Sequence, residues 1–263
     1  MSRLDGAFAA MRDEGRTGLI AYITAGDPDL AQTPGILAAL QQGGADVVEL
    51  GIPFSDPLAD GPVIQRASER ALRSGTTLER SLAMLASIRP DVTVPVVVFT
   101  YANPVLRMGA DRFAERAVGA GVDGVLVLDL PIEEAGSLRQ TLSGAGIDTI
   151  FLLSPTTTRA RIERAAALGS GFLYGISRLG VTGARAAVSG EAAALARRVR
   201  EVTAMPLAIG FGVSRPEHVA EIGAFADAAV VGSSLVAMIA DAASVPDLES
   251  RVTEYVRWLT GRA

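Results

Sequence analysis

Cysteine and lysine are absent from this chain of 263 residues, and histidine occurs once, at His218. All 24 basic residues are therefore arginine. Without a lysine amine the chain cannot hold pyridoxal phosphate or a substrate as an imine, and without cysteine it has no thiol nucleophile. Zinc and iron sites are normally built from histidine and cysteine, so no metal site of that kind is expected. Carboxylates become the leading candidates for catalysis.

Strong charge and long apolar runs are also missing. The net charge is −5, and no segment is strongly basic or alternates arginine with aromatic residues, so no nucleic-acid partner is expected. The apolar runs are short and interrupted by charged residues or glycine, and residues 1–16 contain acids but no apolar signal core. These features predict a cytoplasmic protein with no membrane partner.

Short aliphatic segments alternate with helical patterns along the whole chain. The stretches between them, such as 33–45 and 110–121, have apolar residues three and four positions apart and often end in glycine, as helices do. The segments themselves have the length and composition of buried strands. They cover residues 18–24, 46–50, 94–100, 124–130, 148–153, 171–176, 206–211 and 227–232.

Eight such units predict a single (β/α)₈ TIM barrel domain over residues 1–263, with an added N-terminal helix and extra helices in the connection after strand 2. The two extra helices are expected within 62–73 and 77–89. A doubly wound sheet with a dinucleotide site is the alternative, but "AGDPD" follows the first strand where that fold needs a glycine-rich fingerprint. In a barrel, the loops that follow the strands form the active-site face.

The second strand and its loop, "VVELGIPFSDPLADGPVIQ", contain three acids. Side chains alternate along a strand, so Glu49 points into the barrel mouth if Val48 and Leu50 pack against helices. Loss of hydration there would raise its pKa from about 4.3 toward neutrality, as a general acid/base requires. The alternative is a solvated rim residue. Asp60 and Asp56 each have an alternative reading as turn or helix-start acids.

Glycine-containing segments follow the last three strands, at 177–183, 210–213 and 232–234. Barrels commonly bind a phosphate between the loops after strands 7 and 8, where a helix begins. Backbone amides there could hold a dianion without lysine, although glycine is equally typical of tight turns. Tyr174 and Tyr101 follow or end strands but are more often packing residues, and His218 is expected to have no catalytic role. The phosphate candidates are Gly183, Gly212, Gly232 and Ser233.

Seven motifs together resemble the tryptophan synthase alpha subunit family. The resemblance runs from about residue 4 to residue 260, with the motifs in family order. They are "YITAGDP", "VELGIPFSDPLADGPVIQ", "VFTYANPV", "VLDLPIEE", "SRLGVTG", "GFGVS" and "VGSS".

The resemblance implies a lyase that cleaves indole-3-glycerol phosphate to indole and glyceraldehyde 3-phosphate by a retro-aldol step. Glu49 would be its acid/base, and Asp60 would stabilise the positive charge that grows on the indole ring. The four phosphate candidates would hold the substrate phosphate. The residues implied around the indole and glycerol are Tyr22, Ile64, Tyr101, Tyr174, Thr182 and Phe211.

The resemblance also implies a partner, a beta subunit that carries pyridoxal phosphate in an alpha2-beta2 complex, while this chain itself has no cofactor. Two other functions stay open: a catalytically silent allosteric partner of that subunit, and another phosphate-binding barrel enzyme. The loops after strands 2, 3 and 4 would contact the beta subunit. Their implied interface residues are Pro53, Asp56, Pro57, Asn103, Pro104, Asp129 and Pro131.

Overall fold

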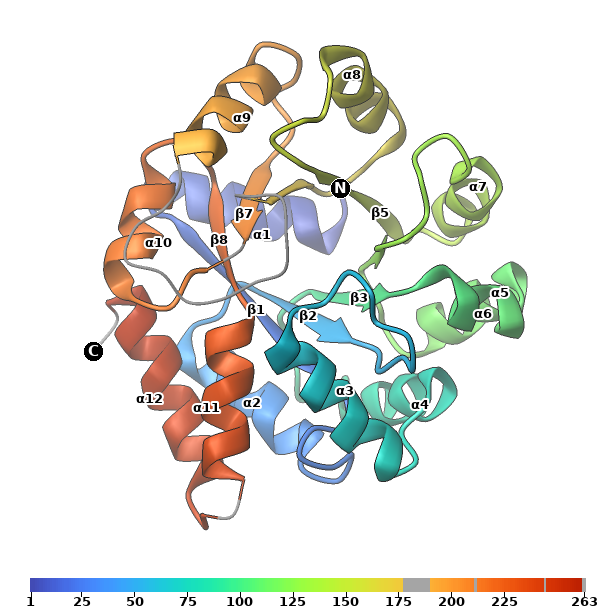
Figure 1. Cartoon of the computed structure of the whole chain (residues 1–263), viewed down its shortest axis with the longest axis vertical. Coiled ribbons are helices and arrows are strands. Elements are labelled where there is room, and N and C mark those ends of the chain that lie inside the picture. Colours follow the sequence, from blue (N-terminus) through green and yellow to red (C-terminus); the bar gives the residue numbers. More distant parts are fainter. Residues whose placement is uncertain (177–189, 211, 244, 262–263) are drawn as a thin grey trace.

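The computed structural model describes residues 1–176, 190–210, 212–243 and 245–261 and arranges eight strands in one closed barrel, in the order β1 to β8. Each strand pairs in parallel with the next, and β1 pairs with β8 (Figure 1). The predicted barrel is therefore confirmed. The strands are β1 (Gly18–Thr24), β2 (Val47–Gly51), β3 (Val96–Thr100), β4 (Gly124–Val127), β5 (Asp148–Leu153), β6 (Leu173–Ile176), β7 (Leu207–Gly210) and β8 (Ala228–Val231).

Helices surround the barrel, as Figure 1 shows. The predicted N-terminal helix, the two helices after β2 and the helix within 110–121 are present, but the short helix directly after β3 and the second helix after β8 were not predicted. Before β5 the helices are α1 (Arg3–Asp13), α2 (Thr33–Gly43), α3 (Pro62–Arg73), α4 (Leu78–Ile88), α5 (Ala102–Met108), α6 (Ala110–Gly119) and α7 (Gly136–Gly144). After β5 they are α8 (Arg159–Leu168), α9 (Gly190–Arg200), α10 (Pro216–Gly223), α11 (Ser233–Ala242) and α12 (Leu248–Thr260).

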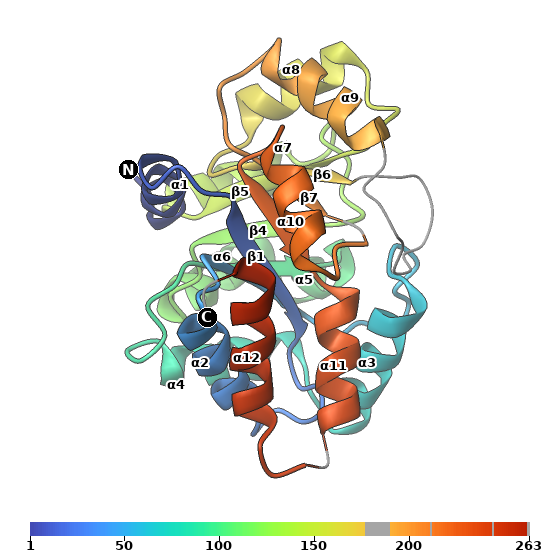
Figure 2. The same ribbon diagram turned by 90° about the vertical axis from the view of Figure 1, so that its left-hand side faces the viewer.

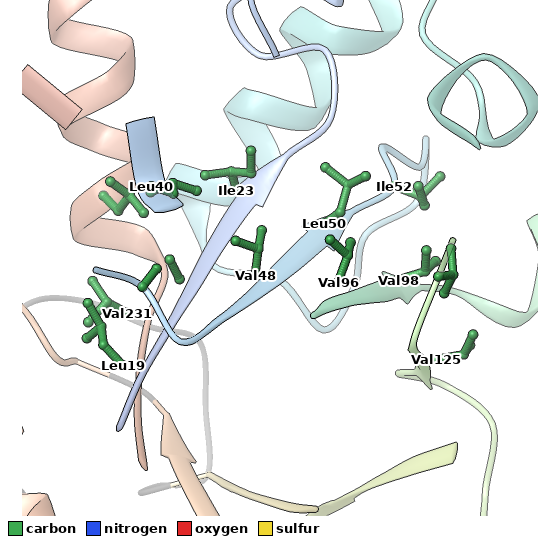
Figure 3. Packing of buried hydrophobic residues seen from close by; sticks show 14 of the residues in the cluster. Leu19, Ile23, Leu40, Val48, Leu50, Ile52, Val96, Val98, Val125 and Val231 are labelled. Carbon is green, nitrogen blue, oxygen red and sulfur yellow. The ribbon is translucent and has the colours of Figure 1, made fainter. Parts of the chain in front are cut away.

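Two separate apolar clusters show which way the strand residues face. Val48 and Leu50 of β2 belong to the outer cluster, between the barrel and its helices (Figure 3). Val47 belongs to the inner cluster, which fills the barrel and includes Leu4 and Phe8 of α1. Figure 2 shows α1 at one edge of the molecule, away from α3. The inner side of β2 therefore points into the barrel, and α1 closes the end opposite α3.

Three aspartates at the α1 end of the barrel are paired, whereas Asp148 at that end has one carboxyl oxygen without a partner among the described residues. Asp46, Asp123 and Asp227 each precede a strand, accept a backbone N–H from the neighbouring strand and form an ion pair with an arginine. Such pairing stabilises a partly buried carboxylate. At the other end of the barrel Asp27 is paired with Arg70, but Glu49 and Asp60 have no ion pair among the described residues. Within the described residues, none of the helices combines the length and apolar character needed to span a membrane.

Candidate active site

Glu49 lies inside the barrel, beside Tyr22 of β1 and Val97 of β3. Its side chain is fully buried, and among the described residues neither carboxyl oxygen has a hydrogen-bond partner. Burial raises the pKa of Glu49 to about 8. The inward orientation and the loss of hydration agree with the sequence prediction, and the alternative of a solvated rim residue is wrong.

A carboxyl group with this pKa is mostly protonated at pH 7 and can therefore donate a proton. Most buried polar groups in native proteins find a hydrogen-bond partner, and those that do not often serve a function. The paired aspartates at the α1 end of the barrel show that this chain does engage acids where they are structural. Of the buried acids among the described residues, Glu49 alone leaves both carboxyl oxygens without a partner, whereas Asp148 at the α1 end leaves one.

Asp60 lies in the loop before α3, and its side chain does not cap that helix. Gly61 is the N-cap residue and Pro62 the first residue of α3, which agrees with the helix expected within 62–73. The Tyr101 hydroxyl instead donates to Asp60 Oδ2 at 3.0 Å and accepts the N–H of Ala59 at 3.2 Å. Burial raises the pKa of Asp60 to about 6, although the Tyr101 bond acts in the opposite direction. Asp60 therefore remains mostly ionised at pH 7.

A cavity of about 440 Å³ opens at this end of the barrel, with Asp60 in its wall. Much of the wall consists of aliphatic and aromatic side chains from the ends of the strands. These residues were not among those predicted from the sequence, but strand alternation identifies several of them, since Phe99 lies two positions beyond the inward-facing Val97. The additional apolar lining residues are Leu58, Ala59, Val63, Phe99, Leu128, Leu152, Ile176, Val213, Val230 and Ala237.

Tyr22 and Tyr174 lie near both candidate acids. Each hydroxyl interacts electrostatically with Glu49 and Asp60, and burial raises the pKa of both tyrosines well above the ordinary value. Both side chains line the cavity, as does Ile64 of α3. Glu49 itself does not line the cavity but is enclosed beneath its surface.

Glycine is required where the two tyrosines approach neighbouring strands. A Cβ at Gly210 would lie 2.2 Å from the Tyr174 hydroxyl oxygen, and one at Gly51 would lie 2.2 Å from that of Tyr22. We expect Gly210→Ala to displace Tyr174 and to raise the KM for indole-3-glycerol phosphate, the substrate that the resemblance implies. The substitution should also lower the free energy of unfolding by about 1–3 kcal/mol. Steady-state kinetics and denaturant unfolding check this. Gly136→Ala is the control, because a Cβ there meets nothing within 4 Å; equal behaviour of the two variants would contradict the prediction.

Small residues and a helix start form the other end of the cavity. Gly212 has a φ of +83°, which favours glycine, and it lies in the loop after β7. Gly232 is the N-cap of α11, and Ser233 is the first residue of that helix. The first N–H groups of a helix lack intrahelical acceptors and carry partial positive charge, so they favour an anion. Gly212, Gly232 and Ser233 all line the cavity, together with Ser214 and Ser234.

Three of the predicted site residues, Thr182, Gly183 and Phe211, lie outside the residues that the structure describes. Tyr101 is buried, but it is not part of the cavity wall and reaches the site through Asp60. The described residues contain no group of three or more histidine, aspartate or glutamate side chains placed to hold a metal ion.

The residues predicted to contact a partner lie on the loops after β2, β3 and β4. Pro53 is buried in this chain, whereas Pro57 and Pro104 are partly exposed. Two leucines on the same loops are strongly exposed, Leu58 at 88% and Leu106 at 72%. The remaining predicted partner residues, all exposed, are Asp56, Asn103, Asp129 and Pro131.

Comparison with known proteins places the whole barrel in one family. A family model described as "Tryptophan synthase alpha chain" matches residues 8–259. The tryptophan synthase alpha chain of Solibacter usitatus is 49% identical over 98% of this chain and 97% of its own length. That of Methylococcus capsulatus is 50% identical over 94% and 93% of the two chains.

A solved structure gives the same result for the fold. The crystal structure of tryptophan synthase subunit alpha from Legionella pneumophila str. Paris superposes with a TM-score of 0.90 and 35% sequence identity, covering 100% of this chain and 98% of that one. The barrel, the acids at its mouth and these matches agree. The chain belongs to the tryptophan synthase alpha chain family.

Proposed function

We propose that Glu49 and Asp60 perform in this chain the reaction of its family, the cleavage of indole-3-glycerol phosphate to indole and glyceraldehyde 3-phosphate in tryptophan biosynthesis. The observation that supports this most strongly is the pair of acids with different protonation at pH 7. Glu49 has a pKa of about 8 and Asp60 one of about 6, at the same end of the barrel. Environments that separate the pKa values of two acids in this way are typical of acid/base sites.

The first step would be protonation of the indole ring. Glu49, protonated at pH 7, donates its proton to indole C3, and the ring nitrogen becomes positively charged. The Asp60 carboxylate accepts the indole N–H and stabilises that charge, as preorganised groups do in transition states. Because Glu49 is fully enclosed in the structure, its side chain has to turn toward the cavity before this step.

The second step would break the carbon–carbon bond. The Glu49 carboxylate removes the proton of the hydroxyl group on the carbon attached to C3. The electrons of the O–H bond form the aldehyde, and those of the broken C–C bond return to the ring to give neutral indole. Glu49 ends the cycle protonated, as it began. The indole ring accepts the electrons of the broken bond. The reaction therefore needs no imine, and no lysine to form one.

The two ends of the cavity suit the two ends of the substrate. The apolar wall, including Phe99, Leu128 and Leu152, would contact the indole ring. The start of α11 with Gly212, Gly232 and Ser233 would bind the phosphate, together with Gly183, which lies outside the described residues. Tyr22, Ile64 and Tyr174 would position the substrate between these ends, with Thr182 and Phe211 from the part of the chain outside the described residues.

A bell-shaped pH profile is expected for kcat/KM, which reports ionisations of the free enzyme. Activity should fall below about pH 6 as Asp60 becomes protonated, and above about pH 8 as Glu49 loses its proton. Measuring kcat/KM from pH 5 to 9 tests this. A profile that rises through pH 8 would mean that Glu49 starts the reaction as a carboxylate, contrary to the first step.

We also propose that this chain pairs with a beta subunit in an alpha2-beta2 complex, as expected for its family, in the cytoplasm and as a single domain. The exposed Leu58 and Leu106 on the β2 and β3 loops would join the predicted interface residues. Pyridoxal phosphate would reside only in the beta subunit, and this chain would bind no cofactor of its own.

The deciding experiment is an assay of indole released from indole-3-glycerol phosphate by the purified chain, with and without a beta subunit. Turnover that increases with the beta subunit is expected. Activation of the beta subunit without any lyase turnover would instead favour a silent allosteric partner. Turnover of a different phosphorylated substrate alone would favour another barrel enzyme.

A further inference from the structure

The loop after β7 is held by two side chains that take no part in the proposed chemistry. Residues 212–214 of this loop line the phosphate end of the cavity. His218 of α10 bonds to it from one side, and Ser234 of α11 bonds to it from the other. Both bonds go to the loop backbone, so they constrain its conformation directly.

His218, the single histidine of the chain, is buried in the first turn of α10. Its Nδ1 accepts the backbone N–H of Ser214 at 3.3 Å, and its Nε2 lies 3.3 Å from the Arg215 guanidinium. Acceptance at Nδ1 requires that this nitrogen carry no proton, so the neutral ring carries its proton on Nε2 and the Arg215 guanidinium beside Nε2 makes a contact but donates no hydrogen bond to it. The ring therefore fixes the end of the loop that leads into α10.

Ser234 fixes the middle of the same loop. Its hydroxyl donates to the backbone oxygen of Val213 at 2.9 Å. Because Ser234 belongs to the first turn of α11, this bond joins the loop to the helix start that forms the other half of the phosphate end. Tyr255 of α12 interacts with the Ser234 side chain from behind. The Ser234 hydroxyl group therefore connects the loop after β7 with the start of α11, the two segments that form the phosphate end of the cavity.

We propose that His218 and Ser234 are positioning residues for the substrate phosphate, an inference that rests on the proposed function. Gly212 has a positive φ and can adopt many other conformations, so its loop has to be fixed by neighbouring contacts. An anion site made of backbone amides binds well only when those amides are preorganised. His218, which does not line the cavity, and Ser234, whose hydroxyl is directed to the Val213 oxygen, supply that preorganisation.

The test compares His218→Phe with His218→Asn, using inorganic phosphate and indole as separate probes. Phe keeps the ring but removes the acceptor, whereas the Asn side-chain oxygen takes the place of Nδ1. We expect His218→Phe to weaken inorganic phosphate binding about tenfold, the effect of one lost hydrogen bond, and to raise KM with little change in kcat. His218→Asn should stay near the unaltered protein. Indole, which has no phosphate, should bind equally well to all three.

Two further variants make the result specific to the loop. Ser234→Ala should weaken phosphate binding to a similar degree, and it still tests the proposal if His218→Phe does not fold. Val219→Ala, a buried neighbour on α10 that faces the outer cluster, should lower stability alone. Unchanged phosphate binding in Ser234→Ala and in folded His218→Phe would overturn the proposal. So would an equal loss of indole binding, or failure of His218→Asn to restore phosphate binding.

The binding assays also separate this proposal from the proposed function. If the unaltered chain releases no indole, but the variants bind phosphate more weakly than the unaltered chain does, the positioning role stands and the reaction assignment fails. If it releases indole and the variants bind phosphate normally, the reaction stands and the positioning role fails.

Discussion

Glu49→Gln is expected to lower kcat by at least ~10²-fold, the scale of a lost general acid/base, while phosphate binding is retained. Gln has nearly the size of Glu but can neither donate a proton to indole C3 nor accept one from the hydroxyl group. The phosphate end is formed by other segments, so it should be unaffected. Single-turnover measurement of indole release would give the rate of the chemical step. Near-normal turnover would refute the assignment of Glu49.

Asp148→Asn is the matched control for this variant. Asp148 is also a buried acid with an unpartnered carboxyl oxygen, but it is the first residue of β5 and therefore lies at the opposite end of the barrel. Its replacement should leave kcat unchanged. Equal rate losses in both variants would indicate a general effect of changing buried acids in the barrel and not a specific role of Glu49.

Glu49 should also make the stability of the protein depend on pH. The folded-state pKa of about 8 lies above the ordinary value of 4.5, so the folded chain holds the proton more tightly. This contribution is complete below about pH 4.5 and is lost as the pH rises to about 8. At about 1.4 kcal/mol per pH unit, the loss reaches roughly 3 kcal/mol at pH 7. Denaturant unfolding at several pH values measures how the free energy of unfolding changes with pH. Between about pH 4.5 and pH 8 it should change less in Glu49→Gln than in the unaltered chain.

Asp60→Asn is expected to lower kcat by about 10²–10³-fold, the usual effect of removing one group that stabilises transition-state charge. The Asn amide can still accept the Tyr101 hydroxyl bond with its oxygen. The Asn NH₂ group then points toward the indole N–H, so that two hydrogen-bond donors face each other. No negative charge remains there to stabilise the positively charged ring. Phosphate affinity should be retained. Stopped-time assays of indole release together with phosphate binding check both parts.

The control for Asp60→Asn is Asp91→Asn, an exposed acid just before β3 and thus away from the cavity. It should behave as the unaltered chain. If Asp60→Asn kept its full rate, Asp60 would be an acid of the loop with no part in the reaction. The acid limb of the pH profile should also disappear in this variant, since Asn does not titrate.

Local sequence patterns were sufficient to predict most of the strands and helices of the barrel. The aliphatic segments 18–24 and 148–153 coincide with β1 and β5, and 62–73 coincides with α3. Buried parallel strands read as continuous apolar runs, which makes them easy to recognise. The segment of α5 is short and contains Pro104, so it has no helical period long enough to detect. Whether residues 1–263 fold as a single domain remains a prediction.

The sequence by itself determined that Glu49 lies on the face of its strand opposite Val48 and Leu50, because side chains alternate along a strand, and it predicted that this face points into the barrel if those two residues pack against helices. It also indicated Asp60 and the glycine-rich phosphate end by their motifs. These properties depend on residues close together in the chain or on fixed strand geometry, so they can be read without coordinates.

Only the tertiary structure decided what surrounds these residues. Tyr101 bonds to Asp60 from 41 positions away, and the cavity wall combines residues from strands throughout the chain. His218 was expected to have no catalytic role, and the packing of α10 brings its ring to the backbone of Ser214. Hydrogen bonding and desolvation depend on distance in space, and only closure of the barrel sets those distances. The same closure leaves the carboxyl group of Glu49 without a partner among the described residues.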